Sequence, residues 1–99
     1  MAQTKTEIRT QVGISYPSRY SVVIWNDDFT PMDFVIQLLV EVFNRSLEQA
    51  SDITMEIHQN GKAVAGTYSK EIAEQKSYEA TVITRHSGHP LNITCETTA

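Results

Sequence analysis

The sequence of 99 residues has one cysteine, Cys95, so no disulfide can form within the chain. Its four glycines are scattered rather than gathered in a phosphate-binding loop, and no serine or cysteine lies in a recognisable nucleophile elbow. The metal-binding spacings HExxH and CxxC are also absent from the sequence. These absences predict a protein that is not an enzyme, with no catalytic residues, no cofactor and no bound metal.

Positive charge is scarce as well. Eight Lys and Arg residues are outnumbered by twelve Asp and Glu residues, the net charge is −4, and the basic residues form no run. We therefore expect neither nucleic acid nor an anionic membrane surface as a partner, because both select clustered positive charge. No apolar stretch is long enough to span a bilayer, and residues 1–16 contain no apolar block like that of a signal peptide. Together with the single cysteine, this predicts a cytoplasmic location.

The composition fits one globular domain, since 40% of the residues are apolar. Residues 1–18 are rich in Thr and Gln and poor in apolar side chains, and we expect them to form a flexible N-terminal tail. Residues 19–99 are then the folded domain, which we expect to be a monomer.

The folded region is predicted to open with a strand followed by a helix. Residues 20–25 are apolar and β-branched and lead into three turn-forming residues, a pattern typical of a strand. Thr30 is expected to cap a helix that begins at Pro31, with Asp33 returning a bond to the cap. Pairs of apolar residues then recur every four positions, which predicts a wide buried stripe along this helix.

A second helix is predicted after Ser46 and Gln49, which match a capping box, and it should end near the glycine at position 61. The remaining elements are a strand at residues 63–68, a helix at 70–85 capped by Ser69, and a strand at 91–95. The inner side of the last helix is expected to carry Ile72, Ala73, Ala80 and Ile83.

This order of elements is strand, helix, helix, strand, helix, strand. It predicts the α+β class, with a three-stranded antiparallel sheet covered on one face by three helices.

One segment of the sequence is specific enough to suggest a family. Residues 26–35 read Asn-Asp-Asp-Phe-Thr-Pro-Met-Asp-Phe-Val, and this segment resembles the ClpS family. The resemblance continues at residues 57–63, at 68–76 and at His89-Pro90-Leu91, and it covers roughly residues 19–96 without large gaps. ClpS proteins are adaptors that recognise N-degrons for the ClpA–ClpP protease, so the resemblance implies an adaptor function here.

The resemblance also implies roles for particular residues. Asn26, Asp28 and His58 are expected to receive the α-ammonium group of the first residue of a bound protein. The pocket for the side chain of that first residue is expected to be lined by Ile24, Thr30, Met32, Val35, Thr54, Ile57 and Leu91. Met32 matches a gate residue against β-branched side chains, and Thr54 stands where many members have methionine. Glu71 and Lys76 match positions that contact the unfoldase, and the tail before Pro17 matches the segment engaged during delivery.

The residue types suit this chemistry. A free N-terminus is a cation with three hydrogen-bond donors beside a side chain, so its receptor needs acceptors at a rim and apolar walls below. An amide oxygen, a carboxylate and a neutral histidine nitrogen are all acceptors. The resemblance implies that the ligands are proteins that begin with Leu, Phe, Tyr or Trp, and that the partner is an unfoldase of the ClpA or ClpC type.

Two other classes of protein are compatible with parts of the sequence. Asp27, Asp28 and His58 are residue types that a metal-dependent hydrolase could use, although paired-ligand spacing is lacking. A structural module resembling the C-terminal domain of the ribosomal stalk protein would have a similar fold but would not need the three acceptors. Taken alone, the Asn-Asp-Asp segment is a polar turn and the Glu71–Lys76 pair is part of a solvated helix face.

Overall fold

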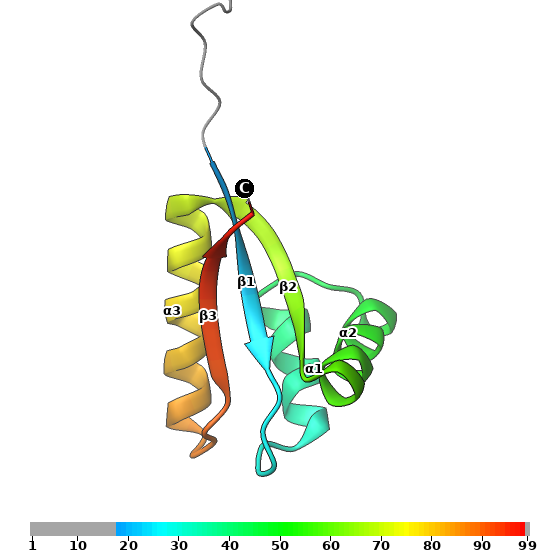
Figure 1. Cartoon of the computed structure of the whole chain (residues 1–99). Coiled ribbons are helices and arrows are strands. Elements are labelled where there is room, and N and C mark those ends of the chain that lie inside the picture. Colours follow the sequence, from blue (N-terminus) through cyan, green and yellow to red (C-terminus); the bar gives the residue numbers. More distant parts are fainter. Residues whose placement is uncertain (1–17, 99) are drawn as a thin grey trace, which may run out of the picture.

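The computed structural model describes residues 18–98 (Figure 1). The elements are β1 (Arg19–Trp25), α1 (Met32–Glu41), α2 (Leu47–Asn60), β2 (Lys62–Ser69), α3 (Lys70–His86) and β3 (Asn92–Thr97). Their order and class are those predicted from the sequence, and the element bounds differ by only a few residues. The predicted tail, residues 1–18, lies outside the described residues except for Ser18.

The strands form one antiparallel sheet in the order β2-β1-β3 (Figure 1). The central strand β1 pairs along its whole length with β2, from Arg19 opposite Ser69 to Trp25 opposite Lys62. The register shifts between Val22 and Val23, so that one residue of β2 is left out of the pairing as a bulge. The carbonyl of that residue, Ala65, instead accepts a hydrogen bond of 2.8 Å from Nε of Arg45, in the connection between α1 and α2.

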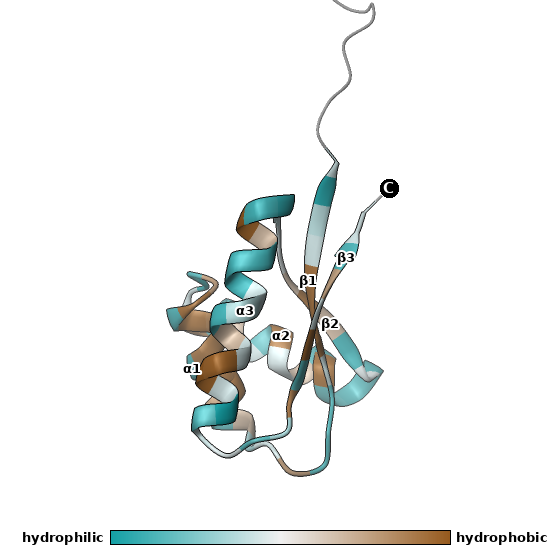
Figure 2. Cartoon of the chain, turned by 90° about the vertical axis from the view of Figure 1, so that its left-hand side faces the viewer, coloured by the Kyte–Doolittle hydropathy of each residue, from teal (hydrophilic) through white to brown (hydrophobic). Residues whose placement is uncertain are grey.

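The helices enclose the core on one side of the sheet, with α2 beside the β2 edge (Figures 1 and 2). Because β1 has a strand on each side, Ser21 to Ile24 are all buried. Val22 and Ile24 contribute to a single core that also takes the apolar stripe of α1, and Figure 2 shows that α1 contains many apolar residues. The fifteen buried members of the core are Val22, Ile24, Val35, Leu38, Leu39, Val42, Phe43, Ala50, Ile57, Ala63, Ala65, Ala73, Ala80, Leu91 and Ile93.

The helix ends agree only in part with the sequence-based predictions. The capping box of α2 is confirmed, since Ser46 Oγ accepts from the Gln49 amide at 3.1 Å while Gln49 Oε1 accepts from the Ser46 amide at 3.1 Å. Gly61 ends α2 with a φ of 90°, a conformation that glycine adopts without strain. The predicted cap by Thr30 is wrong, because Pro31 holds the N-cap position of α1 without any side-chain bond. Ser69 holds the N-cap position of α3, but its side chain makes no capping bond either.

The buried face of α3 also differs from the prediction. Ala73 and Ala80 are buried as expected and Ile83 is partly buried, but Ile72 is 42% exposed. The third buried residue of the helix is Thr84. The buried residues therefore recur at spacings of seven and four, and Ile72 lies about 100° away from this stripe.

The close approach of Gly66 in β2 to the ring of Tyr68 can be tested by mutation. A Cβ at this position would overlap the ring of Tyr68, which also carries the ammonium of Lys76 at 5.5 Å from its centre. We predict that Gly66→Ala lowers the free energy of unfolding by about 1–3 kcal/mol, because the ring must move. Chemical denaturation of the wild type, Gly66→Ala, Tyr68→Ala and the double variant measures the coupling. The prediction is wrong if Gly66→Ala costs as much in the Tyr68→Ala background as in the wild type.

Candidate functional site

The predicted polar residues lie at one end of the sheet, where β1 runs into the loop before α1. The amide of Asn26 donates a hydrogen bond of 2.8 Å to the carbonyl of Gly61, the residue that ends α2. The amide of Gly61 in turn donates to the carbonyl of Ile57 at 2.9 Å, so the last turn of α2 is tied to the end of β1. His58 belongs to that last turn. The structure therefore brings Asn26 and His58, which are 32 positions apart in the sequence, to the same end of the molecule.

The three predicted acceptors share the same surroundings. Asn26, Asp28 and His58 are all exposed. Within residues 18–98, no hydrogen bond engages the side chain of any of the three, although the backbone around them is tightly bonded. Their acceptor atoms are therefore available to a ligand at this end of the sheet.

The predicted pocket residues divide into a buried group and a surface group. Ile24, Val35, Ile57 and Leu91 belong to the core, and each is at most 5% exposed. Ile24, Val35 and Ile57 lie close in sequence to a predicted acceptor or to the loop before α1, whereas Leu91 lies in the segment before β3. For example, Ile24 is two residues before Asn26, and Ile57 directly precedes His58. The apolar set therefore extends from the core toward the exposed acceptors.

The remaining predicted pocket residues vary in exposure. Met32 is 41% exposed at the first turn of α1, and Thr30 is half-buried just before it. Thr54 is only 3% exposed, and its hydroxyl donates to the carbonyl of Ala50 at 2.7 Å. The hydroxyl of Thr54 therefore already makes its donor bond inside α2.

Asp27 is the residue of the Asn-Asp-Asp segment that turns inward. Its Oδ2 accepts hydrogen bonds from the amides of Phe29 at 2.9 Å and Thr30 at 3.0 Å. Burial raises the pKa of this carboxyl, but the amide bonds and the nearby imidazole of His89 outweigh burial and lower its pKa overall. Sequence reasoning named Asp27 only in the hydrolase alternative and gave it no role in binding an amine. The spacing from an aspartate to amides two and three residues later is the pattern of an Asx turn, and it could have pointed to this role.

The segment before β3 is also fixed by side chains that the sequence did not single out. One Nη of Arg85 donates to the carbonyls of His89 at 3.0 Å and Leu91 at 2.8 Å. The ring of His89 packs edge-on against Phe34 of α1, with 4.6 Å between the ring centres. These contacts hold Leu91 against the start of α1, close to the predicted pocket.

The two residues predicted to contact an unfoldase differ from each other. Glu71 is exposed in the first turn of α3. Lys76 was expected to be equally free, but its Nζ donates to the carbonyl of Val42, the residue that ends α1, at 2.9 Å. The reason is geometric, because the lysine reaches across the ring of Tyr68 to a carbonyl that the helix leaves without a partner.

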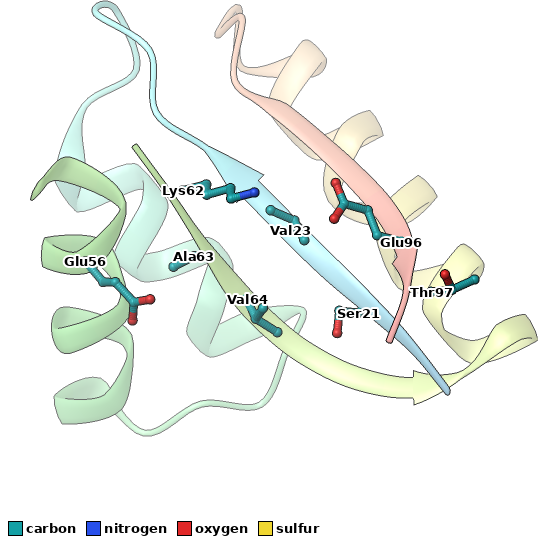
Figure 3. Close-up of a pocket in the computed structure, with 8 residues that line it drawn as sticks. All are labelled: Ser21, Val23, Glu56, Lys62, Ala63, Val64, Glu96 and Thr97. Atoms are coloured by element: carbon teal, nitrogen blue, oxygen red, sulfur yellow. The ribbon is translucent and has the colours of Figure 1, made fainter. Parts of the chain in front are cut away.

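A separate hollow of about 230 Å³ lies at the face of the sheet that the helices leave open (Figure 3). Glu56 of α2 borders it, and its walls carry both signs of charge. None of the predicted site residues lines it. Its lining residues are Ser21, Val23, Glu56, Lys62, Ala63, Val64, Glu96 and Thr97.

Two further findings concern metal binding and membrane spanning. In the described part of the chain, no three His, Cys, Asp or Glu side chains are placed so that they could hold a metal ion. Asp27, one of the three residues of the hydrolase alternative, accepts hydrogen bonds from two backbone amides. Among residues 18–98 no helix has the length and apolar character needed to cross a membrane.

Comparison with known proteins agrees with the resemblance noted in the sequence. The family model described as "ATP-dependent Clp protease adaptor protein ClpS" matches residues 15–94. An ATP-dependent Clp protease adapter protein ClpS from Vibrio atlanticus is 46% identical over 80 residues, covering 81% of this chain and 76% of the relative. One from Desulforapulum autotrophicum is 43% identical over 94 residues, covering 95% and 88%.

A solved structure extends the likeness to the fold. It is that of Agrobacterium tumefaciens ClpS2 bound to L-phenylalaninamide, which matches with a TM-score of 0.80 and 38% identity over 83% of this chain and 99% of that one. The chain belongs to the ClpS family of ATP-dependent Clp protease adaptor proteins.

Proposed function

We propose that this protein is an adaptor that binds the free, bulky N-terminal residue of other proteins and delivers them to a Clp unfoldase–protease. The observation that carries the proposal is the bond between the Asn26 amide and the Gly61 carbonyl. It sets exposed acceptors beside the end of a buried apolar cluster. L-Phenylalaninamide, the molecule bound to the solved relative, combines a free amine with a large apolar side chain. A structural module of the ribosomal stalk type would have no use for such an arrangement.

The amine is received at the rim. In this proposal Asn26 offers its side-chain oxygen, Asp28 its carboxylate, directly or through a water, and neutral His58 a ring nitrogen. Hydrogen bonds to a charged group contribute about 1.5–3 kcal/mol each. Burial of one large apolar side chain contributes about 1.5–3 kcal/mol more. After the costs of association, these terms support binding of roughly −8 kcal/mol, a dissociation constant near micromolar.

The side chain of the first residue enters a pocket whose walls are Ile24, Val35, Ile57 and Leu91. Because these four residues are also core residues, the walls are held in place by the rest of the fold. Met32 lies at the surface, where a gate must lie. Thr54 is shorter than the methionine common in the family and widens the pocket. It adds no free hydrogen-bond donor, because its hydroxyl is bonded to Ala50.

The first test compares two peptides that begin with Phe and differ only in acetylation of the first amine. Acetylation removes the charge and two or more charge-assisted bonds, so we predict at least about a hundredfold weaker binding. Calorimetric titration measures both affinities. His58→Ala should weaken binding of the free peptide and leave the acetylated peptide unaffected. Equal affinity of the wild type for the two peptides would refute the proposed function.

A second test concerns the gate. We predict that Met32→Ala raises the affinity for peptides that begin with Val or Ile by about tenfold, with little change for Phe. Met55→Ala is the matched control, because Met55 is exposed to a similar extent but lies on α2. If Met32→Ala leaves the discrimination between Phe and Val unchanged, Met32 is not the gate.

We further propose that the partner is the N-terminal domain of an unfoldase of the ClpA or ClpC type, contacted by Glu71 and Lys76. Glu71 supports this role by its exposure at the start of α3. Lys76 is anchored to Val42, so its remaining donors present a charge at a fixed position. Residues 1–18 act in delivery, residues 19–99 form the binding domain, and the adaptor works as a cytoplasmic monomer that is not itself an enzyme.

Glu71 gives the cleaner test of this surface, since replacing Lys76 would also remove the bond to Val42. We predict that Glu71→Lys weakens binding to the unfoldase domain by about tenfold or more while affinity for a Phe-initiated peptide stays the same. Glu79→Lys, the same change two turns later on the exposed side of α3, is the control. Equal losses for the two variants would point to a general charge effect rather than a contact at Glu71.

A further inference from the structure

We propose that Asp27 is a positioning residue of the amine site, because it fixes the turn that carries Asn26 and Asp28. This inference rests on the proposed function. Asp27 itself does not touch the ligand in this account. It acts through the two neighbours whose acceptors point outward.

The turn is tied at both ends by hydrogen bonds. At its start, the amide of Asn26 is held by the carbonyl of Gly61 at 2.8 Å. At its end, the amides of Phe29 and Thr30 are held by Oδ2 of Asp27 at 2.9 and 3.0 Å. Asp28 lies between the two ties, and its own side chain makes no hydrogen bond within residues 18–98. The direction of the Asp28 carboxylate therefore depends on the backbone that Asp27 holds.

The N-terminus of α1 receives no side-chain cap at that point. Pro31 holds the N-cap position of α1 and offers no side-chain bond, and Thr30 does not act as a cap. Oδ1 of Asp27 and Oγ1 of Thr30 are buried without a hydrogen-bond partner among the described residues. The Oδ2 bonds of Asp27 are thus the side-chain interaction that closes the loop ahead of α1. Without them the backbone of residues 27–30 gains alternatives to its present course.

The same turn borders the segment that carries Leu91. The imidazole of His89 lies close enough to Asp27 to help lower the pKa of its carboxyl, and the His89 ring packs against Phe34. A turn that shifts would therefore disturb the rim and one wall of the pocket together. Recognition of a small group is sensitive to displacements of this kind, since sites lose affinity when their supporting residues are left loose.

Two substitutions separate the geometry of Asp27 from its charge. Asn has an acceptor oxygen at the same distance along the side chain, so Asp27→Asn keeps both amide bonds and loses the charge. Glu keeps the charge, but its extra methylene moves the carboxylate away from the amides, so Asp27→Glu loses the geometry. Asp33→Ala is the matched control, because the Asp33 carboxylate accepts only from the amide of the next residue, Phe34.

The experiment is a calorimetric titration of a Phe-initiated peptide with a free amine into the wild type and the variants Asp27→Ala, Asp27→Asn, Asp27→Glu and Asp33→Ala. We expect Asp27→Ala and Asp27→Glu to bind about tenfold or more weakly, and Asp27→Asn and Asp33→Ala to stay within about threefold of the wild type. Amide exchange followed by NMR should show faster exchange of Phe29 and Thr30 in Asp27→Glu but not in Asp27→Asn.

The possible outcomes are distinct. If Asp27→Asn binds as weakly as Asp27→Glu, the charge of Asp27 acts on the ligand directly and the positioning role is wrong. If every variant binds like the wild type, the positioning role is wrong while the proposed function stands. If the wild type itself does not bind the peptide, the positioning role and the proposed function are both wrong. Should Asp27→Ala fail to fold, the comparison of Asp27→Asn with Asp27→Glu still tests the positioning role.

Discussion

The hydrogen bond from the amide of Asn26 to the carbonyl of Gly61 is the constraint on which the candidate site depends. It joins the end of the central strand to the end of α2, and it forms only because Trp25 pairs with Lys62 in the preceding rung of the sheet. Gly61 can occupy that position because it tolerates a φ of 90°. A helix and a strand that are distant in sequence thereby end side by side, with His58 in the last turn of the helix and Asn26 directly after the strand.

The apolar residues below this rim have two tasks that conflict in part. As core residues, Ile24, Val35, Ile57 and Leu91 must be packed closely enough to stabilise a small domain. As pocket walls, they must leave room for a guest side chain. All four lie near the ends of their elements or just beyond them. In the proposed function, their packing toward the middle of the sheet stabilises the fold, while the guest side chain would contact them at the end of the sheet.

The sequence predicted the order of elements, the α+β class and the α2 capping box, because each depends on local patterns or on a periodicity that nothing in the tertiary structure overrides. It was wrong about Thr30 as a cap, because the loop is closed by Asp27, and a choice between two nearby cap residues depends on the course of the loop. It was also wrong about the freedom of Lys76, since the partner carbonyl of Val42 is 34 residues away. The burial of Ile72 was overestimated because periodicity gives a face of a helix but not its exact rotation against the sheet.

The site residues also divide into those that the sequence could identify and those whose role depends on the folded chain. Their identities came from a resemblance, and their roles at an amine site and a side-chain pocket stay predictions. The backbone bonds of Asp27 and Arg85 were not predicted, because they join side chains to backbone groups of other residues and appear only once the chain is folded. Side chains that support a site are in general harder to foresee than those that meet the ligand.

The antiparallel register also separates the two proposed binding surfaces. The amine rim follows Trp25 at one end of β1, whereas Arg19 at the other end pairs with Ser69, the residue before α3 and Glu71. Six residue steps of strand place these ends roughly 20 Å apart. In Figure 1 the start of α3 and the loop before α1 lie at opposite ends of the sheet. A guest N-terminus and an unfoldase domain can therefore be bound at once, because neither has to displace the other. Ser18, from which the chain enters β1, lies at the same end of the sheet as Glu71, and both residues border one hollow. In the proposed function, an adaptor holds its cargo and the unfoldase together, and two sites at opposite ends of the central strand would meet that requirement.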